Sequence, residues 1–155
     1  MNKDSNKMEY LGNIDLLKIP KTAFLCSQKC PAEVVLKSYE WAKRQREAGN
    51  CIVCSNHSII EKDVFEILLK GNQPLIYVLP RGLKTKWDAA LTRAIENKRL
   101  LIVTPFTQDI KWVTRETSEK KNEFIVLITD QIVVGFANPG GQLEKLLKDR
   151  TYVSL

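Results

Sequence analysis

Five short apolar segments, separated by stretches with helical spacing, constrain the fold of this chain more than any other feature. They are TAFLC (22–26), CIVC (51–54), PLIYVL (74–79), LLIV (100–103) and IVV (132–134). Strands that are apolar along their whole length are buried on both faces, which is typical of parallel sheets covered by helices. The pattern therefore predicts an α/β fold, a single three-layer Rossmann-like sandwich with a mostly parallel sheet.

Helical stripes occupy the segments between these strands. The first helix is expected to begin at Pro31 and to end at about Ala48, just before Gly49. Its apolar side is predicted to be Ala32, Val35, Tyr39 and Ala42. The stripes of the next two helices are Ile60, Val64, Ile67 and Leu68, closed by Gly71, and then Trp87, Leu91, Ala94 and Ile95.

The segment 117–128 is harder to assign, because its FIVLI run has the composition of a strand. Asp130 and the next apolar run at 132–134 favour a helix that packs beneath the following strand. Residues 104–115 show no clear period, and their aromatic residues Phe106 and Trp112 are expected in the core. Residues 1–20 are expected to form a short leading segment with a helical turn at LGNIDLL, and residues 21–155 the domain itself.

Length and composition fit one globular domain of 155 residues. No apolar run approaches the ~20 residues of a membrane span, and the polar start MNKDSNKMEY does not have the pattern of a secretory signal. We therefore expect a cytoplasmic protein without a membrane partner. The formal net charge of +6 permits an anionic partner, but the basic residues are spread along the chain, so a solvated basic surface is the simpler interpretation.

The four cysteines have a spacing that invites a zinc interpretation, Cys26-x3-Cys30 and Cys51-x2-Cys54. However, Cys51 and Cys54 fall in a predicted strand, where residues three apart point to opposite faces. We therefore predict reduced, packed cysteines, with no metal and no cofactor.

In a parallel α/β sheet, ligands bind at the carboxyl ends of the strands, which directs attention to the loops that follow each strand. Ser27, Gln28 and Lys29 follow the first strand, at the beginning of the first helix, where backbone amides and the helix dipole favour anions. The loop after the second strand contributes Ser55, Asn56 and Ser58 as polar candidates, although Ser58 is also a natural helix cap. Arg81 follows the third strand and can pair with a phosphate through two hydrogen bonds. Each of these residues has the alternative interpretation of an ordinary surface residue.

The last apolar strand runs into Asn138-Pro139-Gly140-Gly141, and helical spacing begins immediately afterwards. Paired glycines let the backbone approach an anion closely, and the helix from Gln142 to Lys148 is expected to point its free amides at the same place. We therefore predict an anion site at Asn138, Gly140 and Gly141, with a simple tight turn as the alternative. No P-loop or G-x-G-x-x-G motif occurs, which argues against ATP hydrolysis and ordinary dinucleotide binding.

Several segments together resemble the DNA-processing protein A family (DprA, also called Smf), within the SLOG superfamily of Rossmann-like nucleotide-binding domains. The segments are LGNIDLLKIPKTAFLCSQKCP, AGNCIVCSNHSIIEKDVFEILLKG, PLIYVLPRGL, LLIVTPF and KNEFIVLITDQIVVGFANPGG. Their order and spacing cover residues 11–154. The resemblance implies a strand-end pocket for single-stranded DNA or a nucleotide phosphate, and a recombinase as partner. It places Ser27, Gln28 and Lys29 at a Ser-Arg-Lys motif, Lys121 and Asn122 at an Arg-Asn motif, and 138–141 at a phosphate loop.

The sequence also departs from the family pattern. The glycines of the loop Ser-Gly-x-Ala-x-Gly-Ile-Asp are Ser55 and Ile59 here, and the two pocket arginines are Gln28 and Lys121. Side chains in place of glycine narrow the space for a ligand, and the loss of arginine weakens bidentate phosphate pairing.

Three functions follow from these observations. The first is a non-enzymatic DNA-processing protein that binds single-stranded DNA through Lys29, Arg81, Lys84 and Lys121, with Trp112 or Phe106 stacking a base. The second is a nucleotide-binding protein or hydrolase related to the LOG phosphoribohydrolases, with Glu144 or Glu61 as acid or base. In the third, the pocket is vestigial and the domain is an interaction scaffold, for which a homodimer is one form.

Overall fold

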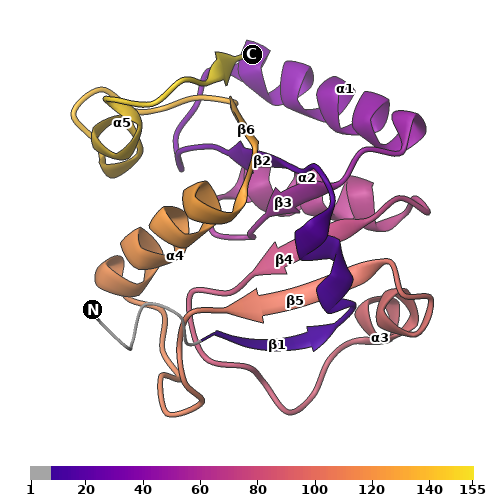
Figure 1. The fold of residues 1–155 in the computed structure, drawn as a ribbon. Coiled ribbons are helices and arrows are strands. Elements are labelled where there is room, and N and C mark those ends of the chain that lie inside the picture. Colours follow the sequence, from indigo (N-terminus) through magenta and orange to yellow (C-terminus); the bar gives the residue numbers. More distant parts are fainter. Residues whose placement is uncertain (1–7) are drawn as a thin grey trace.

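The computed structural model describes residues 8–155, which form a seven-stranded sheet with helices on both faces (Figure 1). The strands are β1 (Glu9–Gly12), β2 (Thr22–Leu25), β3 (Ile52–Cys54), β4 (Leu75–Val78), β5 (Leu100–Thr104), β6 (Gln131–Val134) and β7 (Val153–Ser154). Their order across the sheet is β1-β5-β4-β3-β2-β6-β7. All neighbouring pairs are parallel except β1 with β5, so the predicted mostly parallel sheet is confirmed.

Two hydrophobic clusters, one on each face of the sheet, make the three layers. The helices are α1 (Ala32–Ala48), α2 (Ile59–Leu69), α3 (Ala89–Glu96), α4 (Arg115–Ile128), α5 (Gln142–Leu147) and the 3-10 helix η2 (Ile14–Lys18). Trp41, Phe65 and Leu91 join α1, α2 and α3 to one face. On the other face, Leu16, Ile125 and Leu143 join η2, α4 and α5 to the sheet. The predicted three-layer Rossmann-like architecture is therefore confirmed.

Local sequence explains where the helices begin and end. Pro31 precedes α1, and Gly49 ends it in the left-handed conformation at φ 78°, which glycine adopts without strain. Thr114 and Thr117 form a reciprocal hydrogen-bonded box that starts α4. The helix interpretation of 117–128 is therefore correct.

The buried side of α1 differs from the predicted stripe. Val34, Ser38, Trp41 and Ala42 are buried, whereas Ala32 is exposed and Val35 and Tyr39 are half-buried. Trp41 determines this orientation, because its ring stacks on Phe24 of β2 with centroids 5.2 Å apart. The large indole buries more apolar area than the residues of the predicted stripe.

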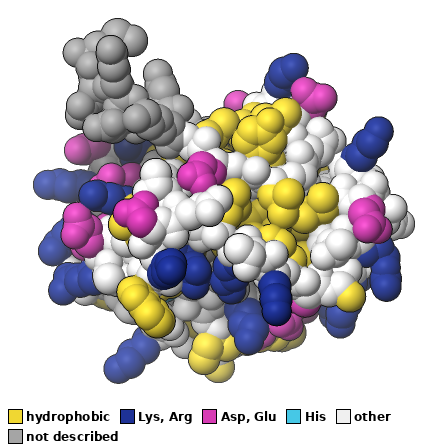
Figure 2. Space-filling model, turned by 90° about the horizontal axis from the view of Figure 1, so that it is seen from below, with side chains coloured by type: hydrophobic (Ala, Val, Ile, Leu, Met, Phe, Trp, Pro, Cys, Tyr) yellow, Lys and Arg dark blue, Asp and Glu magenta, His cyan; other side chains and the backbone are white. Residues whose placement is uncertain are grey.

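Two short edge strands were absent from the sequence prediction. β1 lies within the expected leading segment 1–20 and pairs with β5, and β7 pairs with β6 at the other edge. Residues 1–7 of that segment lie outside the described residues. Met8, Tyr10 and Leu11 are exposed beside the β1 edge. Viewed from this side, hydrophobic side chains occupy the middle of the face, and Lys and Arg side chains are dispersed around it (Figure 2).

The cysteines follow the prediction from strand geometry. Cys51 packs in the cluster beneath α4 and Cys54 in the cluster beneath α1 and α2, so their thiols point to opposite faces. All four cysteines are free. Within residues 8–155, no group of three or more His, Cys, Asp or Glu side chains could hold a metal ion, and no helix has the length and apolarity to cross a membrane.

Candidate functional site at the carboxyl ends of the strands

The order of the sheet creates a switch point between β2 and β6. From β2 the chain proceeds through β3, β4 and β5 on one side, and then returns to place β6 on the other side of β2. Loops leave such neighbouring strands in opposite directions, and ligands of α/β sheets bind in the crevice between them. The two loops at this crevice begin at Cys26 and at Gly135.

Ser27 joins the two loops. Its backbone amide donates to the carbonyl of Phe136 at 2.8 Å, and its hydroxyl accepts the amide of Asn138 at 3.0 Å. Gly135 permits this close approach, because a Cβ there would lie 3.0 Å from the Sγ of Cys26 and 3.1 Å from the Oγ of Ser38. The structure thus brings Ser27 and Asn138 together, as the sequence analysis expected of residues at one strand-end site.

The main-chain amides of 138–141 are not free, contrary to the expectation for this loop. The Gly140 amide donates to the Oε1 atom of Glu144 at 3.0 Å, and the Gly141 amide donates to the carbonyl of Asn138 at 2.9 Å. Glu144 therefore already supplies a negative charge at the place predicted for an external anion. Gly140 has φ 74°, so its glycine is explained by the tight turn that the sequence analysis gave as the alternative.

A hollow of about 360 Å³ at the end of β6 also disfavours an anion. Gly135 and Phe136 line it, together with two carboxylates, those of Glu33 and Glu144. The glycine loop by itself is thus a poor phosphate site. Positive charge at the strand ends has to come from the neighbouring loops.

Gln28 and Lys29 lie on the exposed loop after β2. The Nε2 atom of Gln28 is 3.3 Å from Nε2 of His57, so this side chain bridges the loops after β2 and β3. Lys29 is exposed and makes no ion pair within residues 8–155. Its ammonium group is available to a ligand at this edge.

Glu61 fixes the beginning of α2 beneath these loops. Its carboxylate accepts the backbone amides of Ser58 and Cys26, each at 3.1 Å, and the Ser58 hydroxyl accepts the Glu61 amide at 3.1 Å. Ser58 is therefore used as a helix cap, the structural alternative weighed for it. Both side chains are almost fully buried, so their contribution to a site is to hold the loops in place.

Lys121 is the most unusual residue at this end of the sheet. It lies on α4 with 0% exposure, and its Nζ atom has no hydrogen-bond partner among the described residues. Burial lowers the pKa of Lys121, and the negative charge of Glu61 opposes this shift. Burial also lowers the pKa of His57, with Lys121 as the next cause. The buried amine is therefore near enough to Glu61 and His57 to interact with both electrostatically.

Ser55 is a second buried polar residue at this end of the sheet. Its hydroxyl is fully buried at the end of β3 and likewise lacks a partner within residues 8–155. Buried polar groups without partners are rare and unfavourable, and they concentrate at functional positions. The strand-end site thus holds two unsatisfied groups that an entering oxyanion could satisfy.

The remaining predicted residues do not gather at this crevice. Arg81 is half-buried, and its Nε atom lies 3.4 Å from the carbonyl of Gly82. Asn122 lines a separate hollow of about 300 Å³ between α4 and α5. Asn56 is exposed and lines a groove between α2 and α3. Trp112, expected in the core, is 80% exposed on the loop after β5.

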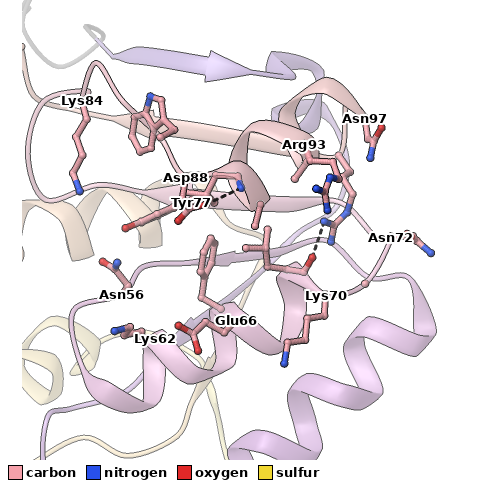
Figure 3. A pocket seen from close by; sticks show the side chains of 18 of the residues that line it. Asn56, Lys62, Glu66, Lys70, Asn72, Tyr77, Lys84, Asp88, Arg93 and Asn97 are labelled. Atoms are coloured by element: carbon pink, nitrogen blue, oxygen red, sulfur yellow. Dashed lines mark hydrogen bonds between the residues drawn. The ribbon is translucent and has the colours of Figure 1, made fainter.

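The groove between α2 and α3 was missed by the sequence analysis. It has a volume of about 770 Å³ and is rich in basic and aromatic side chains (Figure 3). Lys62 and Glu66 on α2 and Lys70 directly after it stand four residues apart, and this spacing was the signal in the sequence for one polar helix face.

Comparisons with known proteins identify the fold. No family model matches the sequence, and no curated protein matches it significantly. Among solved structures, DNA-processing protein A from Helicobacter pylori, described in terms of a single-stranded DNA binding mode, has a TM-score of 0.77 at 14% identity. That alignment covers 99% of this chain and 74% of the other.

Two further structures give the range of the likeness. DprA from Streptococcus pneumoniae has a TM-score of 0.73 at 21% identity, over 95% of this chain and 54% of that one, so this chain spans about half its length. The molybdenum cofactor carrier protein from Chlamydomonas reinhardtii is more distant, with a TM-score of 0.55 at 13% identity over 87% of this chain and 75% of that one. The chain thus has a divergent form of the Rossmann-like fold of DNA-processing protein A.

Proposed function

We propose that this chain is a DNA-processing protein of the DprA kind, which binds single-stranded DNA at the carboxyl ends of its strands without catalysing a reaction. The fold likeness supports this proposal, since one of the similar proteins is described as binding single-stranded DNA. A cytoplasmic location, a recombinase partner and a homodimer belong to the same proposal.

The observation that carries the proposal is the buried, unpartnered amine of Lys121. A DNA phosphate that enters between the loops after β2 and β3 would give this amine and the Ser55 hydroxyl their missing partner. Lys29 and Gln28 at the rim would hold the neighbouring phosphate, and the exposed Trp112 is available to stack a base.

Catalysis has less support, because the carboxylates available for it are already engaged. Glu61 accepts two backbone amides, and Glu144 accepts the amide of Gly140. An acid or base for a hydrolase of the LOG kind would have to break these hydrogen bonds first.

The test is a fluorescence anisotropy titration of a labelled oligothymidylate across salt concentrations. With about three phosphate contacts, the logarithm of the association constant should fall with that of the salt concentration with a slope of about −2. Lys29→Ala and Lys121→Met should each weaken binding about three- to tenfold, whereas Lys37→Ala on the outer side of α1 is the matched control.

Equal binding of duplex and single strand, or binding independent of salt, would contradict the proposal. A large thermal stabilisation by a mononucleotide, with none by the oligonucleotide, would support the nucleotide-binding alternative. No binding of either would favour the interaction scaffold.

A further inference from the structure

The groove between α2 and α3 has the chemistry of a second site for single-stranded DNA. We propose that phosphates bind to Lys62 and Lys84 at its rim while an unpaired base stacks on the half-buried Trp87. This proposal takes its ligand class from the proposed function, on which it rests in that respect, but uses residues other than Lys29 and Lys121.

The walls and floor of the groove come from three elements. Lys62 and Glu66 of α2 and Lys70, which directly follows it, line one side. Lys84, Asp88 and Arg93 line the other, with Tyr77 of β4 between the two sides (Figure 3). The volume of about 770 Å³ is within the ~300–1,000 Å³ typical of ligand sites. A few nucleotides are therefore a suitable occupant.

Most of the basic side chains in the groove have no acidic partner. The five basic residues concerned form no salt bridge among the described residues: Lys62, Lys70, Lys84, Lys86 and Arg93. Of the two carboxylates in the lining, Asp88 is engaged, because it accepts the Leu91 amide at 3.0 Å as the cap of α3. Glu66 is left as the only uncommitted acid in this lining, so the groove is positively charged.

Arg99 is not counted among these cations, because it has a structural task. Its guanidinium donates to the carbonyls of Leu68, Leu69 and Gln73 at 2.9–3.0 Å. These hydrogen bonds satisfy the carboxyl end of α2 and join it to the beginning of β4 and β5. Arg99 thus fixes the backbone at this end of the groove, whereas the lysines at the rim form no salt bridge within residues 8–155.

Aromatic side chains distinguish the groove from a simple basic surface. Phe65 and Tyr77 are buried beneath the groove, with ring centroids 4.7 Å apart, and the half-buried Trp87 presents its indole in the lining above them. Burial raises the pKa of the Tyr77 hydroxyl, so it stays neutral at physiological pH. A nucleobase can stack on the indole of Trp87 only when the base is unpaired, which selects a single strand over a duplex.

The groove begins close to the strand-end site. Asn56, in the loop after β3, lines its near end, and the next residue, His57, contacts Gln28 of the loop after β2. Asn72 and Asn97 line the far end, so the groove follows the length of α2. A strand bound at the carboxyl ends of the strands can therefore continue past Asn56 into the groove.

Charge reversal tests the groove separately from the strand-end site. The variant Lys62→Glu/Lys84→Glu is compared with Lys37→Glu/Lys43→Glu, which makes the same change in net charge on exposed positions of α1. In anisotropy titrations with a twenty-nucleotide oligothymidylate, we expect the groove variant to lose at least tenfold in affinity and the control at most threefold. Equal losses in the two variants would overturn the proposal.

Fluorescence of Trp87 gives a direct reading of occupancy. In a Trp112→Phe background, Trp87 is the solvent-accessible indole, since Trp41 is buried. Oligothymidylate should quench it, and should still do so after Lys121→Met, even if the proposed strand-end site fails. If the oligonucleotide does not quench Trp87, the proposal is overturned. It is also overturned, in favour of an acidic peptide as ligand, if poly-glutamate at equal charge concentration displaces the oligonucleotide.

Discussion

Replacing Lys121 by Met should stabilise this protein, which is unusual for a change at a fully buried residue. Lys121 has 0% exposure and an amine without a hydrogen-bond partner among the described residues. A buried polar group left unsatisfied is unfavourable by about 1–3 kcal/mol. Met keeps most of the volume and removes the amine, so the free energy of unfolding should rise by about this amount.

The pH dependence of this effect has a definite sign. The pKa of Lys121 is lowered in the folded state by burial. Between that lowered pKa and the ordinary lysine pKa, the unfolded chain binds more protons than the folded one, so the stability of the natural protein rises with pH. The advantage of Lys121→Met should therefore shrink between pH 7.5 and pH 9.5.

Urea denaturation of both proteins at the two pH values measures this effect. Lys120→Met is the matched control, because Lys120 is exposed and forms only an i,i+4 ion pair with Glu116 at 3.1 Å. We expect its free energy of unfolding to change by less than about 0.5 kcal/mol. Destabilisation by Lys121→Met, or a pH-independent gain, would refute the reasoning. In the former case, the amine would be charged and held by Glu61.

Three other substitutions test the framework of the site, each by urea denaturation. Glu61→Ala removes the acceptor of two buried backbone amides and should lower the free energy of unfolding by about 2–5 kcal/mol, and Glu61→Gln should lower it less. An effect of Glu61→Ala under about 1 kcal/mol would contradict the assigned hydrogen bonds. Arg99→Met removes the side-chain donor to the carbonyls of Leu69 and Gln73, whereas the Leu68 carbonyl keeps the Gln73 side-chain amide as a donor. It should destabilise the protein by about 2–4 kcal/mol, and no change would show that water replaces the guanidinium freely. Gly140→Ala should lower the free energy of unfolding by only about 1–2 kcal/mol. The loss comes from the φ of 74°, and it stays small because no atom lies within 4 Å of the added Cβ. A larger loss would mean that the turn is more crowded than this.

The architecture could be predicted from the sequence because its signals are local. Continuous apolar strands are buried on both faces only in a covered parallel sheet, and the breaks at Pro31 and Gly49 set the limits of α1. Edge strands lack this signal. β7 has two residues and β1 exposes part of its apolar surface, so their pairing depends on neighbours distant in the sequence.

The details of the site depend on contacts that no local pattern specifies. Pro139-Gly140-Gly141 has the composition of an anion loop, but the carboxylate of Glu144 already accepts the Gly140 amide. Trp112 has the composition of a core residue, yet its loop leaves it exposed. In α1, stacking of Trp41 on Phe24 selects the buried side, which the periodicity of the smaller residues did not identify.

Hydrogen–deuterium exchange with and without a twenty-nucleotide oligothymidylate tests the central claim most directly. If the carboxyl ends of the strands bind single-stranded DNA, the backbone amides of residues 27–30 and 55–58 should exchange more slowly in its presence. Protection restricted to the β1 edge, or no change at saturating oligonucleotide, would contradict the account.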